Sequence, residues 1–349
     1  MRRHLIAGVV TIVGIGGAAV AIRAQATGSA EASAAAVVNP KWTAPKLAWG
    51  HPDLEGIWTS DDMRAVPIAR PPQFGTRRYL TNEEFVARAR ERAAARKVDD
   101  ARTGTFRNEE GTRDFGYTSM VIEPADGRIP ALTAEARARP VVRGTSGVGP
   151  FNTIDDFSLW DRCVTRGLAG SWFPVVYGNG TRILQTPDAV IIAHEMVHEA
   201  RVIPLDGRPH VGGGIRQLMG DSRGHWEGST LVIETTNFTD RLPVTGGVRY
   251  SEAMKMTERI TRIDPEMIDF ELRIDDPKTY VTPWTLRMTL TAQSGYEIYE
   301  YGCHEGNRSV PNSLSAERAY EREAAEHARK GLPPPERVFE KVNGDDRGR

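Results

Sequence analysis

The chain has 349 residues, of which 40% are hydrophobic and 26% charged, and its formal net charge is -1. This composition is typical of a globular protein and excludes a multi-span membrane protein, a collagen-like fibre and a fully disordered chain. The chain also lacks the basic block with which proteins neutralise phosphates, so we expect no nucleic-acid partner.

The N-terminal residues 1–26 have the pattern of a signal peptide. Arg2 and Arg3 precede an apolar run over 5–22, and Ala24-Gln25-Ala26 is a small-x-small cleavage pattern. An uncleaved anchor is the alternative, because about 18 apolar residues is near the lower limit for crossing a bilayer. The glycines of the run and the cleavage pattern favour removal. We therefore expect a periplasmic or secreted protein with a flexible lead over 27–50 and no stable membrane insertion.

The chain contains two cysteines, Cys163 and Cys303. In the oxidising compartment that export implies, each can pair within the chain only with the other. We therefore expect a Cys163–Cys303 disulfide.

The region 172–305 alternates β-rich runs with turn signals at short intervals, which predicts an antiparallel meander. The runs are 172–177, 181–185, 189–203, 225–226, 230–237, 254–263, 267–274, 284–291 and 296–303. A sheet of about eight strands with one apolar face has to close on itself to remove its edges. The expected fold is mainly β, a lipocalin-like barrel or a two-sheet sandwich.

Two of these runs alternate clearly enough to assign faces. Apolar residues alternate with charged ones from Ile268 to Ile274, and the expected inward set is Ile268, Phe270, Leu272 and Ile274. From Leu286 to Leu290 the expected inward set is Leu286, Met288 and Leu290, while Arg287 and Thr289 point outward.

Helices are expected at the periphery. A capping box at Thr81 and Glu84 precedes a charged run to about residue 98, and a second run from Ser315 ends before Gly331. The expected organisation is a first strand with a helical and loop region packed on the barrel (51–171), the barrel core (172–305), and a C-terminal helix and tail (306–349).

Gly56-Ile57-Trp58 resembles the Gly-x-Trp signature of lipocalin-type barrels. From about Pro52 to Ser315 the chain resembles a large family of exported bacterial proteins. The matching motifs include PDLEGIW at 52–58, PLDGRPH at 204–210, GDSRGHWEG at 220–228 and CHEGN at 303–307. The resemblance implies export and the fold, and it implies no particular activity.

The segment from His194 to His198 has the H-E-x-x-H form that zinc peptidases use. Zinc binding needs a helix, where residues four apart lie about 6 Å from each other, whereas on a strand they lie about 13 Å apart. A preceding Gly-Asn-Gly turn and many β-branched residues favour the strand. On a strand both imidazoles share one face with Ile192 and Met196, and we expect that face to line the barrel.

The catalytic candidates are His198, Asp221, Glu258 and His304. An unperturbed imidazole can gain or lose a proton near neutral pH, so His198 is the candidate proton carrier. Glu258 lies on an otherwise apolar strand face, so it must be paired or have a raised pKa. A structural pair with Arg201 or Arg287 is as well supported as a catalytic role. Candidate substrate-binding residues are His194, Arg201, Arg216, His225, Trp226, Trp284 and Tyr301.

The sequence therefore predicts an exported barrel enzyme that performs acid–base chemistry, without a cofactor, on a small hydrophobic molecule. The reaction would be a hydration or elimination, an isomerisation or a hydrolysis. One alternative is a carrier that only binds such a ligand. Another is a zinc hydrolase with His194, His198 and His210 as ligands. Convergence of the four catalytic candidates in one pocket would favour catalysis, and their scatter would favour the carrier.

Overall fold

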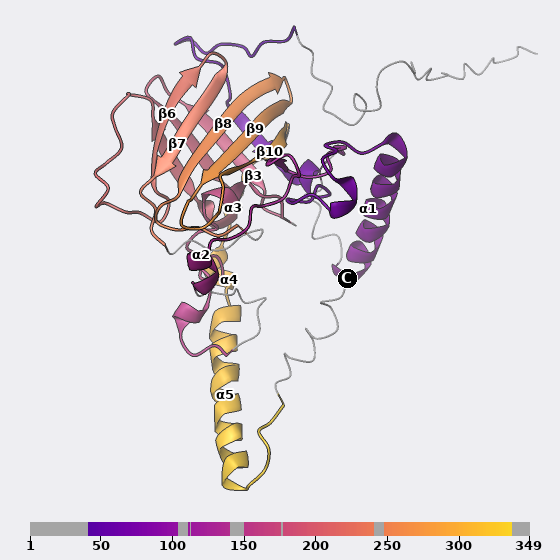
Figure 1. The fold of residues 1–349 in the computed structure, drawn as a ribbon, viewed down its shortest axis with the longest axis vertical. Coiled ribbons are helices and arrows are strands. Elements are labelled where there is room, and N and C mark those ends of the chain that lie inside the picture. Colours follow the sequence, from indigo (N-terminus) through magenta and orange to yellow (C-terminus); the bar gives the residue numbers. More distant parts are fainter. Residues whose placement is uncertain are drawn as a thin grey trace, which may run out of the picture.

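The computed structural model describes residues 41–103, 111, 113–139, 150–175, 177–240 and 248–336. The predicted signal peptide and most of the predicted lead lie outside these residues. The body of the molecule is an antiparallel sheet that curls into a nearly closed barrel (Figure 1). The expected lipocalin-like barrel is therefore confirmed.

The sheet has ten strands, nine of which follow one another in the order β5-β4-β3-β1-β10-β9-β8-β7-β6, while β2 pairs with β10. Their bounds are β1 Gly56–Thr59, β2 Val121–Glu123, β3 Gly180–Gln185, β4 Ala189–His194, β5 Ala200–Pro204, β6 Asp221–Glu227, β7 Thr230–Thr236, β8 Lys255–Asp264, β9 Met267–Asp275 and β10 Trp284–Ala292. The hydrogen-bonded path runs from β5 to β6, and these two end strands lie next to each other where the ring nearly closes.

The inward faces of β9 and β10 are those that the alternation predicted. Ile268, Phe270, Leu272, Ile274, Leu286, Met288 and Leu290 are all buried in one continuous core. Trp58 of β1 joins this core, donates its indole N–H to the Leu54 carbonyl at 2.9 Å and lies under the Arg262 guanidinium.

Two predicted strands are wrong, at 172–177 and 296–303. The first run begins at the end of a short buried helix, α3 (Leu168–Trp172), and the second contains no strand. The reason is β1, which pairs with β3 on one side and with the end of β10 on the other. Strand β1, which is far from β3 and β10 in sequence, thus lies between them, where the two predicted strands would have paired.

The helices are α1 (Asn82–Thr103), α2 (Ala134–Ala138), α3, α4 (Cys303–Gly306) and α5 (Ser309–Arg329). The capping box before α1 forms, with Thr81 and Glu84 bonding to each other's backbone N–H. Helix α5 begins six residues earlier than expected and extends away from the barrel (Figure 1). None of the helices in the described part of the chain has the length and apolar character needed to cross a bilayer.

The expected disulfide is present. Cys163 and Cys303 are bonded, and their Cα atoms lie 5.8 Å apart. The bond joins the segment before α3 to the start of α4, 140 residues later in the chain. Because α3 follows only five residues after Cys163, the disulfide fixes the approach of this helix to the barrel.

The region before residue 124 covers part of the outer surface of the sheet. Strand β2 pairs with β10, and the backbone N–H of Arg287 donates to the Met120 carbonyl at 2.8 Å. The chain around β2 bends over the outward face, where the Tyr117 hydroxyl lies 3.1 Å from that of Thr289. This covering layer is held by bonds such as the one from the Met120 N–H to the Pro67 carbonyl.

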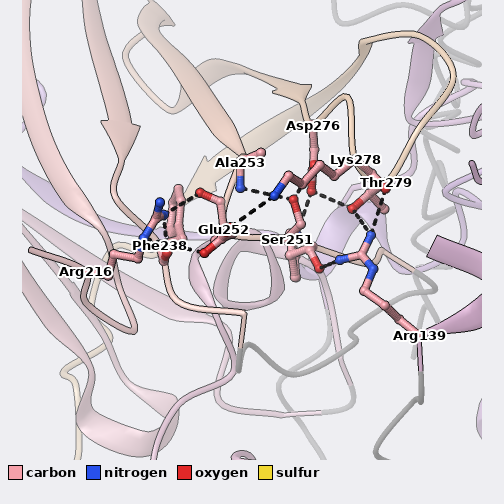
Figure 2. Close-up of polar contacts among 10 residues, drawn as sticks. Arg139, Arg216, Phe238, Ser251, Glu252, Ala253, Asp276, Lys278 and Thr279 are labelled. Atoms are coloured by element: carbon pink, nitrogen blue, oxygen red, sulfur yellow. Dashed lines mark hydrogen bonds and ion pairs between the residues drawn. The ribbon is translucent and has the colours of Figure 1, made fainter. Parts of the chain in front are cut away.

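A polar network joins the loops at one end of the barrel (Figure 2). The buried Asp276 carboxylate accepts hydrogen bonds from the backbone N–H and hydroxyl of Ser251 and from the Thr279 hydroxyl. Arg139 donates to Thr279 and to two backbone carbonyls. All these partners belong to loops, so the network holds these loops together and satisfies their buried polar groups.

Candidate functional site

Polar side chains meet inside the barrel in what we call the interior polar cluster, formed by Trp172, Thr181, His194, Arg201 and Glu258. They come from α3, β3, β4, β5 and β8 respectively. All lie among the buried residues of the core except Arg201, whose side chain is 8% exposed. The cluster therefore lies in a region of low dielectric, where each charge needs a partner.

Glu258 has no exposed surface and accepts hydrogen bonds from two donors. The Trp172 indole N–H donates to it at 2.7 Å, and the Arg201 guanidinium forms an ion pair with the same oxygen. The structure thus selects Arg201 from the two partners that the sequence left open. Arg287, the other, bonds to Asp269 through two of its nitrogens.

His194 is a neutral ring in this environment. Burial lowers the pKa of His194 well below its usual value, and the charges of Arg201 and Arg166 lower it further. The Nδ1 atom lies 2.9 Å from the Thr181 hydroxyl, and the ring meets Trp172 edge to face at 4.8 Å between centroids. Among the described residues, His194 Nε2 and Glu258 Oε2 have no hydrogen-bond partner.

Helix α3 fills the barrel next to these groups. All five of its residues are buried, and the Trp172 ring packs on Phe270 at 4.5 Å between centroids. Glu199 holds the helix in place through the hydroxyls of Thr165 and Ser171, and burial raises the pKa of this carboxyl. The part of the interior that was expected to hold a ligand is occupied here by the chain's own indole.

The expectation that both imidazoles of the H-E-x-x-H segment line the barrel is wrong. Strand β4 ends at His194, residues 195–198 make a tight turn, and β5 begins at Ala200. Val197 and His198 have φ values of 63° and 44° in this turn. His198 is exposed, and its Nδ1 lies 3.4 Å from the Tyr301 carbonyl.

In a continuous strand Val202 would share the inward face of His194 and His198, and the turn reverses this arrangement. Arg201 and Ile203 point into the barrel, whereas Val202 is 63% exposed. Glu195 bonds to the Tyr296 hydroxyl, which lies outside the interior polar cluster. The three motif residues therefore have separate environments.

The alternative zinc ligands are likewise not brought together. His210 Nδ1 lies 2.9 Å from an Asp221 carboxylate oxygen on the outward face of β6, whereas His194 is inside the barrel and His198 is in the exposed turn. Over the described residues, no three His, Cys, Asp or Glu side chains form a group that could hold a metal ion. The placement of these side chains gives the zinc hydrolase no support.

The four catalytic candidates are scattered. Glu258 is inside the barrel, and His198 is in the exposed turn. Asp221 faces outward from β6, where it also pairs with Arg223, and His304 is exposed in α4. These four side chains do not line a common pocket.

The remaining substrate-binding candidates are also dispersed. Arg216 donates to the carbonyls of Phe238 and Glu252 in the loop network of Figure 2. His225 is exposed and pairs with Glu227, while Trp226 packs beside the ring of His51. The last two are Trp284, buried in the core, and Tyr301, stacked on Tyr177.

A pocket lies on the outer face of the sheet, under the covering layer, and we call it the outer pocket. Its cavity volume is about 180 Å³. Its ten lining residues are Arg70, Arg78, Tyr79, Tyr117, Ser119, Ile122, Ile263, Asp269, Arg287 and Thr289. Strands β8, β9 and β10 supply the last four of these, and the region 70–122 supplies the rest.

The guanidinium groups of the outer pocket differ in how they are bound. Arg287 holds Asp269 at 2.6 and 2.7 Å, and this contact raises the pKa of Arg287. Arg70 is buried and donates to the Thr118 hydroxyl and to the carbonyls of Gly75 and Ala125. The exposed Arg78 side chain has no hydrogen bond or ion pair to any described residue.

Sequence reasoning identified only the floor of the outer pocket. The outward orientation of Arg287 and Thr289 was expected from the alternation in β10 and is confirmed by their place in the pocket lining. Arg70, Arg78, Tyr79 and Tyr117 were missed, because no motif or spacing marks them. The only signal in the sequence was weak. The outward faces of the strands carry charged residues, and such a face can be covered by another part of the chain.

Comparisons of the chain with protein-family models, with curated proteins and with solved structures find no match. Function has therefore to be inferred from the geometry described above.

Proposed function

We propose that this protein is an exported binding protein that holds a small molecule in the outer pocket. The observation that carries the proposal is a covered concave site with several polar groups that converge on one cavity. Such sites are where small ligands usually bind. The cavity is small, so the ligand is of the size of a single ring.

The scatter of the catalytic candidates favours binding over catalysis. Acid–base chemistry needs a proton donor and acceptor within reach of one substrate. His198, Asp221 and His304 lie outside the interior polar cluster, and Glu258 is bound through one of its oxygens by Arg201 and Trp172. An enzyme acting on a hydrophobic molecule inside the barrel stays a prediction from the sequence.

Export is the second part of the proposal. It is supported by the signal-peptide pattern of residues 1–26, by the family resemblance and by a disulfide, a bond that persists in oxidising compartments. Mass spectrometry of the protein from the cell envelope should give a mature N-terminus near Thr27. A full-length N-terminus there would contradict cleavage.

Binding is tested by filling the outer pocket. We suggest screening a set of small aromatic and aliphatic compounds against the wild type, the pocket variant Ile122→Trp and the control Val202→Trp, which adds the same indole to an exposed site on β5. We expect saturable binding of some compounds, at least tenfold weaker in the pocket variant and unchanged in the control. Absence of binding, or binding that Ile122→Trp does not affect, would contradict the proposal.

A further inference from the structure

The outer pocket has an excess of positive charge. Three guanidinium groups and one carboxylate line it, which leaves two positive charges when all four are ionised. Arg287 binds both oxygens of Asp269 and also lies 3.8 Å from the Glu271 carboxylate, so its positive charge is neutralised by neighbouring residues. The excess therefore lies on Arg70 and Arg78.

These two arginines repel each other in the absence of an anion. Burial lowers the pKa of Arg70, the charge of Arg78 lowers it further, and the charge of the Asp126 carboxylate acts in the opposite direction. No described carboxylate forms an ion pair with either side chain within 4.0 Å. A negative group in the pocket would relieve this repulsion and make charge-assisted hydrogen bonds.

The arginines keep donors for such a group. Each guanidinium carries five N–H donors. Arg70 uses Nε and Nη1 on protein acceptors, and Arg287 uses Nε and Nη2 on Asp269. These bonds also hold the two side chains in place, so little side-chain entropy is lost when a ligand binds.

Aromatic and aliphatic side chains complete the lining. The rings of Tyr79 and Tyr117 lie 5.9 Å apart between centroids at an interplanar angle of 43°. Ile122 and Ile263 add apolar surface. An inorganic anion such as phosphate would leave these surfaces unused, whereas a flat ring would contact them.

The volume limits the size of the ligand. A cavity of about 150 Å³ is large enough to hold benzene. The outer pocket, at about 180 Å³, has room for one six-membered ring with a small substituent.

We infer that the ligand of the outer pocket is a single-ring aromatic carboxylate, whose charge is bound by Arg78 and Arg70 and whose ring lies against the two tyrosines. This inference rests on the proposed binding function and adds the chemical class of the ligand to it.

The test is calorimetric titration of the full chain with four matched compounds. Benzoate is the probe, benzamide has its shape without the charge, cyclohexanecarboxylate has the charge without the aromatic ring, and inorganic phosphate is an anion without a ring. We expect benzoate to bind at least tenfold more tightly than each of the other three.

Two variants assign the charge to its residue. Arg78→Gln should weaken benzoate binding at least tenfold, and Arg78→Lys should recover part of that loss. Arg208→Gln, which removes an exposed guanidinium outside the pocket lining, should change the affinity less than twofold. Equal melting temperatures of the variants and the wild type would show that folding is unaffected.

Each other outcome overturns a definite part of the inference. Benzamide binding as tightly as benzoate would overturn the charge, and tight binding of cyclohexanecarboxylate or phosphate would overturn the aromatic ring. An affinity that Arg78→Gln does not change would overturn the role of Arg78. If benzoate does not bind but other compounds do so in an Ile122→Trp-sensitive manner, the class is wrong and the proposed binding function stands.

Discussion

The interior polar cluster and the outer pocket both combine arginine with a carboxylate but differ in how these charges are neutralised. Inside the barrel, one arginine faces one carboxylate, and an indole N–H completes the set. In the outer pocket three arginines meet one carboxylate, and Arg78 has no described ion-pair partner. A buried charge has to be neutralised by the chain itself, whereas a partly solvated one can stay available for a ligand.

The first test removes the carboxylate of the interior polar cluster. Glu258→Ala would leave the Arg201 charge buried and unpaired, which costs about 3–5 kcal/mol of the free energy of unfolding. Urea denaturation measures this loss.

A double variant and a surface control sharpen this test. Adding Arg201→Ala to Glu258→Ala should restore part of the lost stability, because it removes the unpaired charge. Glu234→Ala, at an exposed ion pair with Lys255, should cost at most about 1 kcal/mol. If Glu258→Ala lowers the free energy of unfolding no more than this control does, the Arg201–Glu258 pair does not contribute to the stability of the barrel.

The second test uses pH. The pKa of His194 is well below its usual value, mainly because of burial. The unfolded chain takes up a proton below about pH 6.5, whereas the folded chain does not, so stability falls as the pH falls, by up to about 1.4 kcal/mol per pH unit. Urea denaturation at several pH values between 7 and 5 measures this slope.

Variants separate His194 from other titrating groups. Glu199 has a raised pKa, so its contribution has the opposite sign and is lost as the pH rises above its unfolded value of about 4.3. The wild type should therefore be compared with His194→Gln, in which the contribution of His194 is absent. His198→Gln, in the exposed turn, should keep the wild-type slope. A slope that survives in His194→Gln would show that another group is responsible.

The smallest expected effect comes from the outer pocket. Arg78→Gln should change the free energy of unfolding by less than about 0.5 kcal/mol, because the side chain is exposed and bonds to no described residue. Thermal denaturation of this variant beside Arg201→Gln, which leaves Glu258 without its ion-pair partner, compares the two regions directly. A large loss of stability in Arg78→Gln would mean that this arginine has a structural role.

The alternation of apolar and polar residues predicted side-chain orientation correctly within single regular strands. Two-residue alternation placed Phe270 and Leu272 inward and Arg287 outward. The apolar environment of Glu258 indicated either a paired carboxylate or a raised pKa, and the structure shows the pair. The alternation failed at Val197 and His198, which adopt positive φ without the Asn or Gly that usually marks such a turn. The turn at these residues shifts the inward–outward alternation by one position, so the residues of β5 that face the core are those that the sequence pattern placed outside.

The amino-acid sequence alone determined that the protein is mainly β, that its strands are antiparallel, that two helices are peripheral and that its two cysteines could bond only to each other. These properties depend on neighbouring residues or on counting, so they can be read along the chain. The tertiary structure decided that β1 enters between β3 and β10, that α3 fills the barrel, and that Arg70 and Arg78 line one pocket with Arg287. Each of these requires segments distant in sequence to pack together, and packing of that kind leaves no periodic trace in the sequence.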